Sequence, residues 1–95
     1  MFIVTLTFAA NRAAAPEHMD AHNAWLKEGF DDGVFLLAGS LKPALGGGIL
    51  AHNVAREALE ARVARDPFVA QNVVSAEILE LAPARTDERL AFLLD

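Results

Sequence analysis

The segment VFLLAGSL, residues 34–41, decides the fold of this chain of 95 residues. It is a short apolar run, and a turn containing Pro43 follows it, so we expect a buried strand. In a strand, Leu36 would point to one face and its neighbours Phe35 and Leu37 to the other, so the run is apolar on both sides. Both faces of this strand therefore need cover.

The neighbouring segments predict a strand and a helix before this run and a hairpin after it. Residues 2–8 alternate between a fully apolar side and a side with two threonines, which is typical of a strand. Pro16 opens a helix that ends near Phe30, and Gly33 marks its exit. After the turn, residues 47–52 are predicted to form the return strand of a hairpin.

The C-terminal half predicts a second helix, a fourth strand and a short last helix. Asn53 is expected to cap the second helix, in which Leu59 and Val63 lie on one face. Asp66 ends that helix, because a residue before a proline (here Pro67) avoids the helical conformation. The remaining predicted elements are a strand over residues 71–81 and a helix over residues 87–94, capped by Thr86.

The predicted order is β-α-β-β-α-β, the ferredoxin-like arrangement of the α+β class. Right-handed crossovers place both helices on one face of a four-stranded antiparallel sheet, in a single domain over residues 1–95. The other face is then bare, although the second and fourth strands are apolar on both sides. We therefore expect two sheets to pack face to face in a homodimer, as a dimeric α+β barrel. The alternative is that the C-terminal segment covers the bare face within one chain.

Composition argues against several classes of partner. The formal net charge is −5 and the basic residues are scattered, so we expect no nucleic-acid partner. The absence of cysteine excludes a disulfide framework and fits a cytoplasmic protein. No apolar run could span a bilayer and no basic region of a signal peptide is present, so we expect no membrane partner. The hydrophobic fraction of 54% is high for a small chain and favours an oligomer interface.

Few side chains could perform acid–base chemistry near neutral pH. The chain has three histidines and neither cysteine nor tyrosine, and His22 lies on the apolar side of the first predicted helix. If the fold brings Asp66 to His22, the carboxylate would fix the imidazole tautomer and leave the other ring nitrogen to move a proton. Two structural interpretations stay open: His22 bonded to a backbone carbonyl, and Asp66 serving only to end its helix.

Other motifs carry weaker signals. His18 and His22 lie four residues apart and could bind zinc with His52, but the glutamate of a zincin motif is missing, so we expect no metal. Trp25 is expected in the core or at an interface, with ligand contact as a further role. The three glycines at 46–48 precede a strand rather than a helix, which favours a tight hairpin over a phosphate loop.

One ordered set of motifs runs through most of the chain. The set comprises His22, Gly29 or Gly33, Ala38-Gly39-Ser40, Gly47-Gly48 and Asp66-Pro67-Phe68. Together these motifs resemble those of the YciI-like, or YCII-related, family of small dimeric α+β-barrel proteins. The resemblance implies a pocket between helices and sheet in which His22 and Asp66 form a catalytic dyad.

The resemblance also implies the substrate contacts. Ser40 would stand at the polar edge of the pocket. Gly39, which precedes Ser40, and Trp25, about one turn after His22, are our further candidates for substrate contact. Many family members carry an arginine about one turn before the histidine, where this chain has His18 and Met19. Arg12 is therefore the candidate for that contact.

Two functions from different classes fit these residues. The first is an enzyme without a cofactor, in which His22 assisted by Asp66 performs elimination or isomerisation on a small cyclic or quinone-like molecule. Some relatives resemble dehydrochlorinases of chlorinated hydroxyquinones, and the wider barrel superfamily includes muconolactone isomerases. The alternative is a non-catalytic domain that binds or senses a small molecule in the same pocket. A purely structural role in a larger assembly is a third interpretation.

Overall fold

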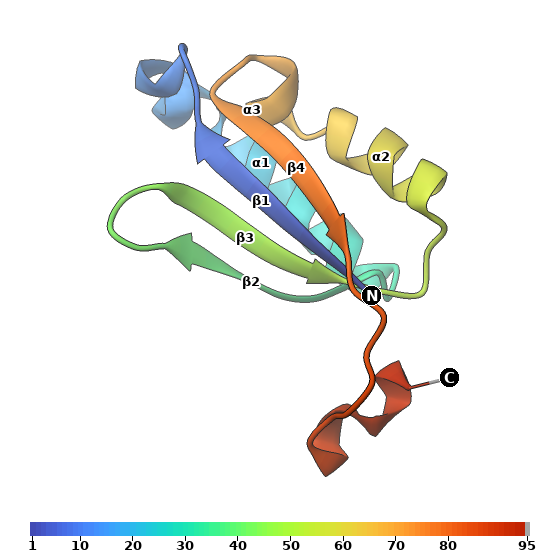
Figure 1. Cartoon of the computed structure of the whole chain (residues 1–95). Helices are drawn as coiled ribbons and strands as arrows, with labels where there is room; N and C mark the ends of the chain where they lie inside the picture. Colours follow the sequence, from blue (N-terminus) through green and yellow to red (C-terminus); the bar gives the residue numbers. More distant parts are fainter. Residues whose placement is uncertain (95) are drawn as a thin grey trace.

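The computed structural model describes residues 1–94, which form a four-stranded antiparallel sheet with helices on one face (Figure 1). The strand order across the sheet is β2-β3-β1-β4. The strands are β1 (Phe2–Phe8), β2 (Phe35–Leu41), β3 (Gly46–Ala51) and β4 (Val74–Glu80). The helices are α1 (Ala15–Asp31), α2 (Arg56–Ala64) and α3 (Pro67–Ala70), with 3-10 helices η1 (Arg12–Ala14) and η2 (Glu88–Leu93). The predicted α+β class and ferredoxin-like order are confirmed.

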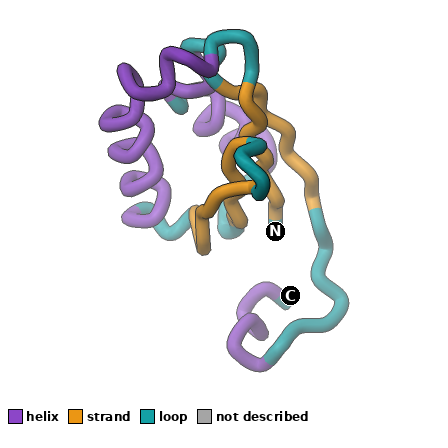
Figure 2. Tube along the Cα trace, turned by 90° about the vertical axis from the view of Figure 1, so that its left-hand side faces the viewer, coloured by secondary structure: helices purple, strands orange, loops and turns teal. Residues whose placement is uncertain are grey.

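The hydrophobic core lies between the sheet and the helices α1, α2 and α3, which are on one side of the sheet (Figure 2). On β1 the predicted alternation is confirmed, because Val4 and Leu6 are buried while Thr5 is half-buried and Thr7 is exposed. The buried apolar residues are Phe2, Val4, Leu6, Trp25, Val34, Phe35, Ile49, Ala51, Leu59, Val63, Phe68, Val73 and Val74.

Three local predictions need correction. Asn53 has a positive φ of 56° in the turn before α2, and the N-cap position belongs to Ala55, which makes no side-chain hydrogen bond. Asp66 does more than end a helix, because its side chain caps a new one, α3, that begins at the next residue. The side chain that caps the last helix is Asp87 rather than Thr86, and that helix is of the 3-10 type.

The strand β2 begins one residue later than predicted and is irregular. Val34 lies in the core just before the strand. A register shift between Phe35 and Leu37 changes which side chains face the helices. Phe35 pairs with Ala51 and is buried, whereas Leu37 pairs with Leu50 and is 52% exposed. Burial of the apolar run thus ends at the bulge: Val34 and Phe35 are buried, and the residues from Leu37 to Ser40 are exposed.

The face of the sheet away from the helices, called the outer face below, carries no second layer within residues 1–94 (Figures 1 and 2). After β4 the chain leaves the sheet, and η2 lies beyond its end. This segment contacts the end of the sheet through Phe92, whose ring centre lies 5.6 Å from that of His52. The C-terminal segment therefore leaves its own outer face open. Among the described helices, none has the length and apolar character to cross a membrane.

Candidate functional site

The histidine and the aspartate that the sequence singles out lie in direct contact. His22 Nδ1 is 2.7 Å from Asp66 Oδ1, although the two residues are 44 positions apart in the chain. Asp66 is fully buried, and the side chain of His22 is 12% exposed. His22 is therefore bonded to a carboxylate rather than to a backbone carbonyl.

The carboxylate of Asp66 is held by the start of α3. Its Oδ1 accepts a hydrogen bond of 3.0 Å from the backbone N–H of Phe68, and Pro67 occupies the first position of the helix. This N-cap geometry points the same oxygen at His22. The second oxygen, Oδ2, is buried without a hydrogen-bond partner among residues 1–94. Both hydrogen bonds of this carboxylate therefore fall on Oδ1.

Aromatic rings fix the plane of the imidazole. The ring of Phe68 is stacked on His22 with centroids 4.0 Å apart and planes 4° from parallel. Trp25 lies 5.9 Å from the same imidazole, packs edge-on against Phe35, and donates its indole N–H to the carbonyl of Arg62 at 3.0 Å. Trp25 thus ties α1 to α2 inside the core.

A cavity of about 330 Å³ lies between α1 and the helix-facing side of the sheet. Part of its floor is made of small residues, because Ser40 pairs with Gly47, and Ala38 lies on the same side opposite the larger Ile49. The volume is in the range of small-molecule sites. The lining residues are Leu6, Phe8, Met19, His22, Asn23, Leu26, Ala38, Gly39, Ser40, Gly46, Gly47, Gly48, Ile49, Phe68 and Val74.

The comparisons with known proteins show the family and the fold of this chain. The model of the YCII-related domain matches residues 1–82. The chain belongs to this family. Among solved structures, this YCII-related domain is similar to 5-chloro-2-hydroxyhydroquinone dehydrochlorinase from Burkholderia phenoliruptrix AC1100 in complex with 2,5-dihydroxybenzoquinone. The sequences are 13% identical, the TM-score is 0.68, and the alignment covers 85% of this chain and 93% of that chain, so the likeness shows the fold. No curated protein matches the chain.

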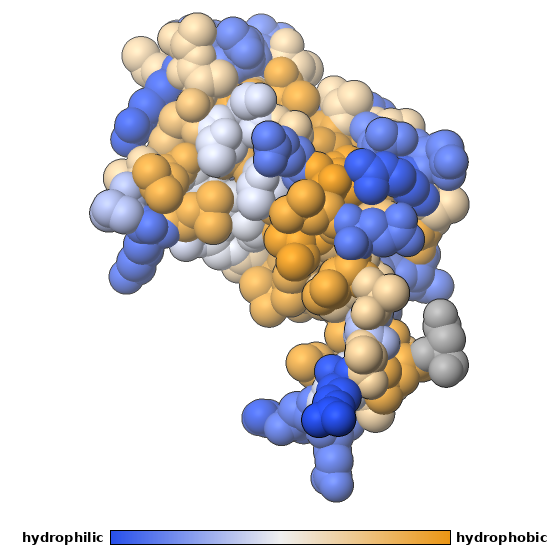
Figure 3. Space-filling model, viewed as in Figure 1, coloured by the Kyte–Doolittle hydropathy of each residue, from blue (hydrophilic) through white to orange (hydrophobic). Residues whose placement is uncertain are grey.

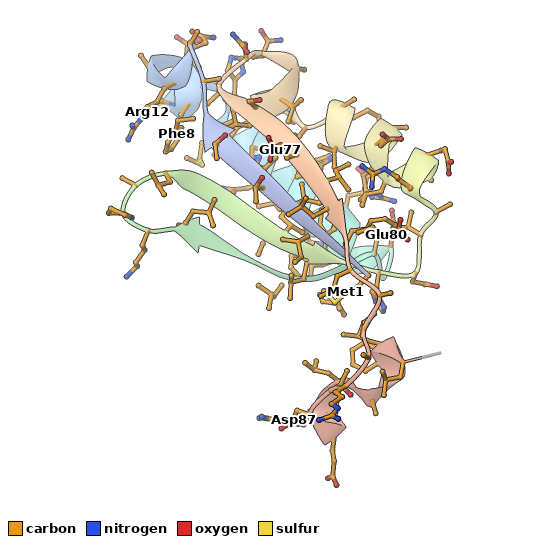
Figure 4. The ribbon with its side chains drawn as sticks, in the orientation of Figure 1. Met1, Phe8, Arg12, Glu77, Glu80 and Asp87 are labelled. Atoms are coloured by element: carbon orange, nitrogen blue, oxygen red, sulfur yellow. The ribbon has the colours of Figure 1, made fainter. Side chains whose placement is uncertain are left out.

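The other site residues expected from the sequence of this YCII-related domain fall into two groups. Ser40 and Gly39 line the cavity with His22. Trp25 and Arg12 do not contribute to the lining. Arg12 is exposed, and its guanidinium carbon lies 4.1 Å from the centre of the Phe8 ring, which does line the cavity (Figure 4). Arg12 therefore lies next to the cavity, with the Phe8 ring between its guanidinium group and the interior.

Two polar or flexible side chains of the lining were not among the predicted site residues. Met19 and Asn23 lie on α1 beside His22 and line the same cavity. Their spacing is the signal that could have revealed them. Met19 lies three positions before His22 and four before Asn23, and residues three or four positions apart share a helix face. Phe68 was noted within its motif, but only the structure shows its ring stacked on His22.

The cavity is mostly apolar and carries little charge. Within the described part of the chain, His22 is the titratable side chain of the lining. Residues 1–94 contain no group of three or more His, Cys, Asp or Glu side chains that could hold a metal ion. The resulting chemistry is that of one imidazole, oriented by a buried carboxylate, with the amide of Asn23 and the hydroxyl of Ser40 as neutral polar groups.

Two pKa shifts occur outside the cavity. The hydrogen bond with Asp31 raises the pKa of Lys27, and the proximity of the opposite charge adds to this effect. Hydrogen bonds from the side chain and then the backbone of Arg89 lower the pKa of Asp87. Both are surface interactions on the described chain and do not reach the imidazole.

Proposed function

We propose that this chain is a cofactor-independent acid–base enzyme, a lyase or isomerase that acts on a small cyclic or quinone-like molecule. The observation that carries the proposal is the contact of 2.7 Å between His22 and the fully buried Asp66, made at the wall of a cavity of about 330 Å³. Buried carboxylate–imidazole pairs beside a cavity are typical of acid–base sites. The dehydrochlorinase of similar fold was solved with a quinone bound.

The two residues would divide the work as base and orienting group. In this scheme Asp66 acts as a carboxylate, which only accepts hydrogen bonds, so Nδ1 of His22 would carry the hydrogen and donate it across the 2.7 Å contact. Nε2 is then the basic nitrogen. It removes a proton from a hydroxyl or an acidic carbon of the substrate. The electron pair left behind forms a new double bond and expels a leaving group such as chloride; for an isomerisation, the proton returns to another carbon.

The remaining polar groups would position the substrate. Ser40 and Asn23 offer a hydroxyl and an amide on the lining, which suit the carbonyl and hydroxyl oxygens of a quinone-like ring. The small residues of the floor, including Gly39 and Gly47, leave room for a flat molecule. Arg12, beyond Phe8, would attract an anionic substituent at the edge of the cavity.

The test is chloride release from 5-chloro-2-hydroxyhydroquinone, with calorimetric binding of 2,5-dihydroxybenzoquinone measured in parallel. Asp66→Asn should lower turnover at least about 100-fold with little loss of binding, since Asn also caps helices but no longer orients the imidazole as a charged acceptor. His22→Gln should lose turnover to a similar degree. His18→Ala is the matched control, because His18 lies one turn away on α1 outside the lining.

Turnover that survives both His22→Gln and Asp66→Asn would contradict the proposal. Binding of the quinone without any chloride release by the wild type would instead favour the alternative function, a non-catalytic domain that senses a small molecule in the same cavity. A third outcome, in which neither compound binds, would remove quinones from the substrate class.

We further propose that the chain is a homodimer. Its outer face exposes large apolar side chains, of which Leu37 is 52% and Leu79 is 54% exposed. Apolar side chains grouped on one face are typical of association surfaces. Analytical ultracentrifugation at micromolar concentration should give the mass of two chains, and a monomer would contradict this prediction.

A further inference from the structure

Two parallel rows of residues cross the outer face. The first row, called the apolar ridge, runs from β2 to β4 through cross-strand pairs and consists of Leu37, Leu50, Ile3 and Leu79. The next row consists of Gly39, Gly48, Thr5 and Glu77. Figure 3, which views this face, shows an orange apolar patch beside a paler band. The face therefore has a ridge of large side chains next to a row that begins with two glycines.

Among residues 1–94, nothing requires glycine at Gly39 or Gly48. Neither has a positive φ, unlike Gly46. A Cβ added at Gly39 would meet no described atom within 4 Å, and one at Gly48 would meet the Leu41 side chain only at an ordinary 3.5 Å. By contrast, a Cβ at Gly46 would collide with the backbone oxygen of Leu6. Glycine within a strand weakens it and often marks the close approach of another group.

The two glycines form the bottom of a hollow on the outer face. A groove of about 300 Å³ lies over them, bordered by Leu37, Leu41 and Leu50. Its walls are almost entirely apolar, so it suits a branched aliphatic side chain. Glu77 stands at the far end of the glycine row on the edge strand β4, where its charge stays at the rim (Figure 4).

We propose that this hollow receives an apolar side chain from the ridge of a second copy of the chain. The inference rests on the proposed homodimer and goes beyond it by naming the surfaces that interlock. In a twofold dimer the same patch occurs on both copies, so each ridge can fill the hollow of the other. A ridge without a hollow would hold two such sheets apart and leave voids at the interface.

The available area fits a second copy of this chain. Four strands of about seven residues have a flat footprint of roughly 450 Å² per copy, taking usual strand spacing and rise. Stable interfaces bury roughly 1,200–2,000 Å² over both partners, so the two sheet faces, with roughly 900 Å² together, supply between about half and three quarters of this area. The C-terminal segment adds exposed Leu90 and Phe92 beyond the family match at residues 1–82, at the end of the same sheet.

The hollow and the candidate active site share one wall. Gly39 and Gly48 border the groove on the outer face and also line the cavity on the helix side, together with Ser40. At this point only the backbone of the sheet separates the two spaces. A side chain of the second copy would thus support the floor of the cavity from behind.

The test is sedimentation of wild type and Gly39→Val across micromolar concentrations. A Cβ at this position meets no described atom within 4 Å, and the methyl groups of valine would occupy the hollow, so we expect the dimer dissociation constant to rise at least about tenfold, as for an overpacked contact. The melting temperature of the dilute, monomeric variant should not fall, because valine favours strands. Ala61→Val, on the exposed side of α2, is the control and should leave association unchanged.

The outcomes separate this inference from the proposed homodimer. A wild-type chain that sediments as a monomer overturns both. A wild-type dimer whose dissociation constant is the same in Gly39→Val overturns the interlocking hollow alone, and its occupant would then be a small ligand or a different protein. Weakened association that appears equally in Ala61→Val would also overturn it.

Discussion

The two faces of the sheet are built from the same strands but have opposite surroundings. On the helix side, Val4 and Ile49 are almost completely buried, and the rows are interrupted only where Ala38, Ser40 and Gly47 leave space for the cavity. On the outer side, large apolar residues stay exposed beside two glycines. One face completes its packing within the chain, and the other does not.

This difference shows how to separate stability from association in a small domain. A residue on the helix side contributes to folding of the single chain, because the helices always cover it. A residue on the outer side contributes little to the stability of the single chain, since it remains in contact with water after folding. Its contribution would come only when a second surface removes that water. The following predictions test the comparison, from the largest effect to the smallest.

The largest stability contrast is expected between two leucines. Leu59 is fully buried against the helix side of the sheet, and Leu79 is 54% exposed on the outer side. Leu59→Ala should lower the free energy of unfolding by about 2–5 kcal/mol, the usual cost of a cavity in a core. Leu79→Ala should change it by about 0.5 kcal/mol or less, as for a surface site. Urea unfolding at low protein concentration measures both, and equal costs would break the comparison.

Alanine substitutions at two glycines should change the free energy of unfolding in opposite directions. Gly46 has a φ of 132° and lies against the backbone of Leu6, so Gly46→Ala should cost more than about 1 kcal/mol of unfolding free energy. Gly39 is free of both constraints, so Gly39→Ala should raise that free energy in the monomer by roughly 0.5–1 kcal/mol. Thermal unfolding of dilute samples decides the signs. A loss in both variants would show that Gly39 is needed within its own chain.

Phe68 tests whether the helix side also sets the geometry of the chemistry. Phe68→Leu should keep the cap at Asp66, since the backbone N–H remains, but it removes the ring stacked on His22. We expect turnover to fall about tenfold, which corresponds to about 1.4 kcal/mol in the barrier, with a smaller change in KM. The nitrogen signals of His22 should still report the tautomer bonded to Asp66, but they should shift as the imidazole loses its fixed plane. Unchanged shifts and turnover would reduce Phe68 to a packing residue.

The smallest effect belongs to the C-terminal segment, outside both faces. The pKa of Asp87 is lowered in the folded chain by Arg89, so its contribution is present above the ordinary carboxyl pKa and is lost as pH falls through the folded value. Asp87→Asn should remove this acid dependence and leave global unfolding unchanged. Hydrogen exchange at the backbone amide of Arg89, followed from neutral to acidic pH, is the measurement. A shift in the global melting temperature would mean that η2 is part of the folded core.

The local sequence pattern was sufficient to predict most helices and strands, but it did not predict several of their boundaries. The alternation in residues 2–8 predicted β1 because a strand places successive side chains on opposite faces. The bulge in β2 escaped notice, because no residue type marks the register shift after Phe35. The helix α3 was missed because four residues are too few to show a helical period. Asn53 was misassigned, since asparagine also suits the left-handed turn it occupies.

The amino-acid sequence by itself determined the order of strands and helices, which residues of each strand share a face, and the small set of groups able to move a proton. These properties depend on backbone periodicity and on residue chemistry within a few positions. Only the tertiary structure decided that His22 meets Asp66 across 44 positions, that Trp25 does not line the cavity, and that Asn23 does. Such contacts depend on how α1 packs against α3 and the sheet, because a shift of one helical turn would place different side chains together.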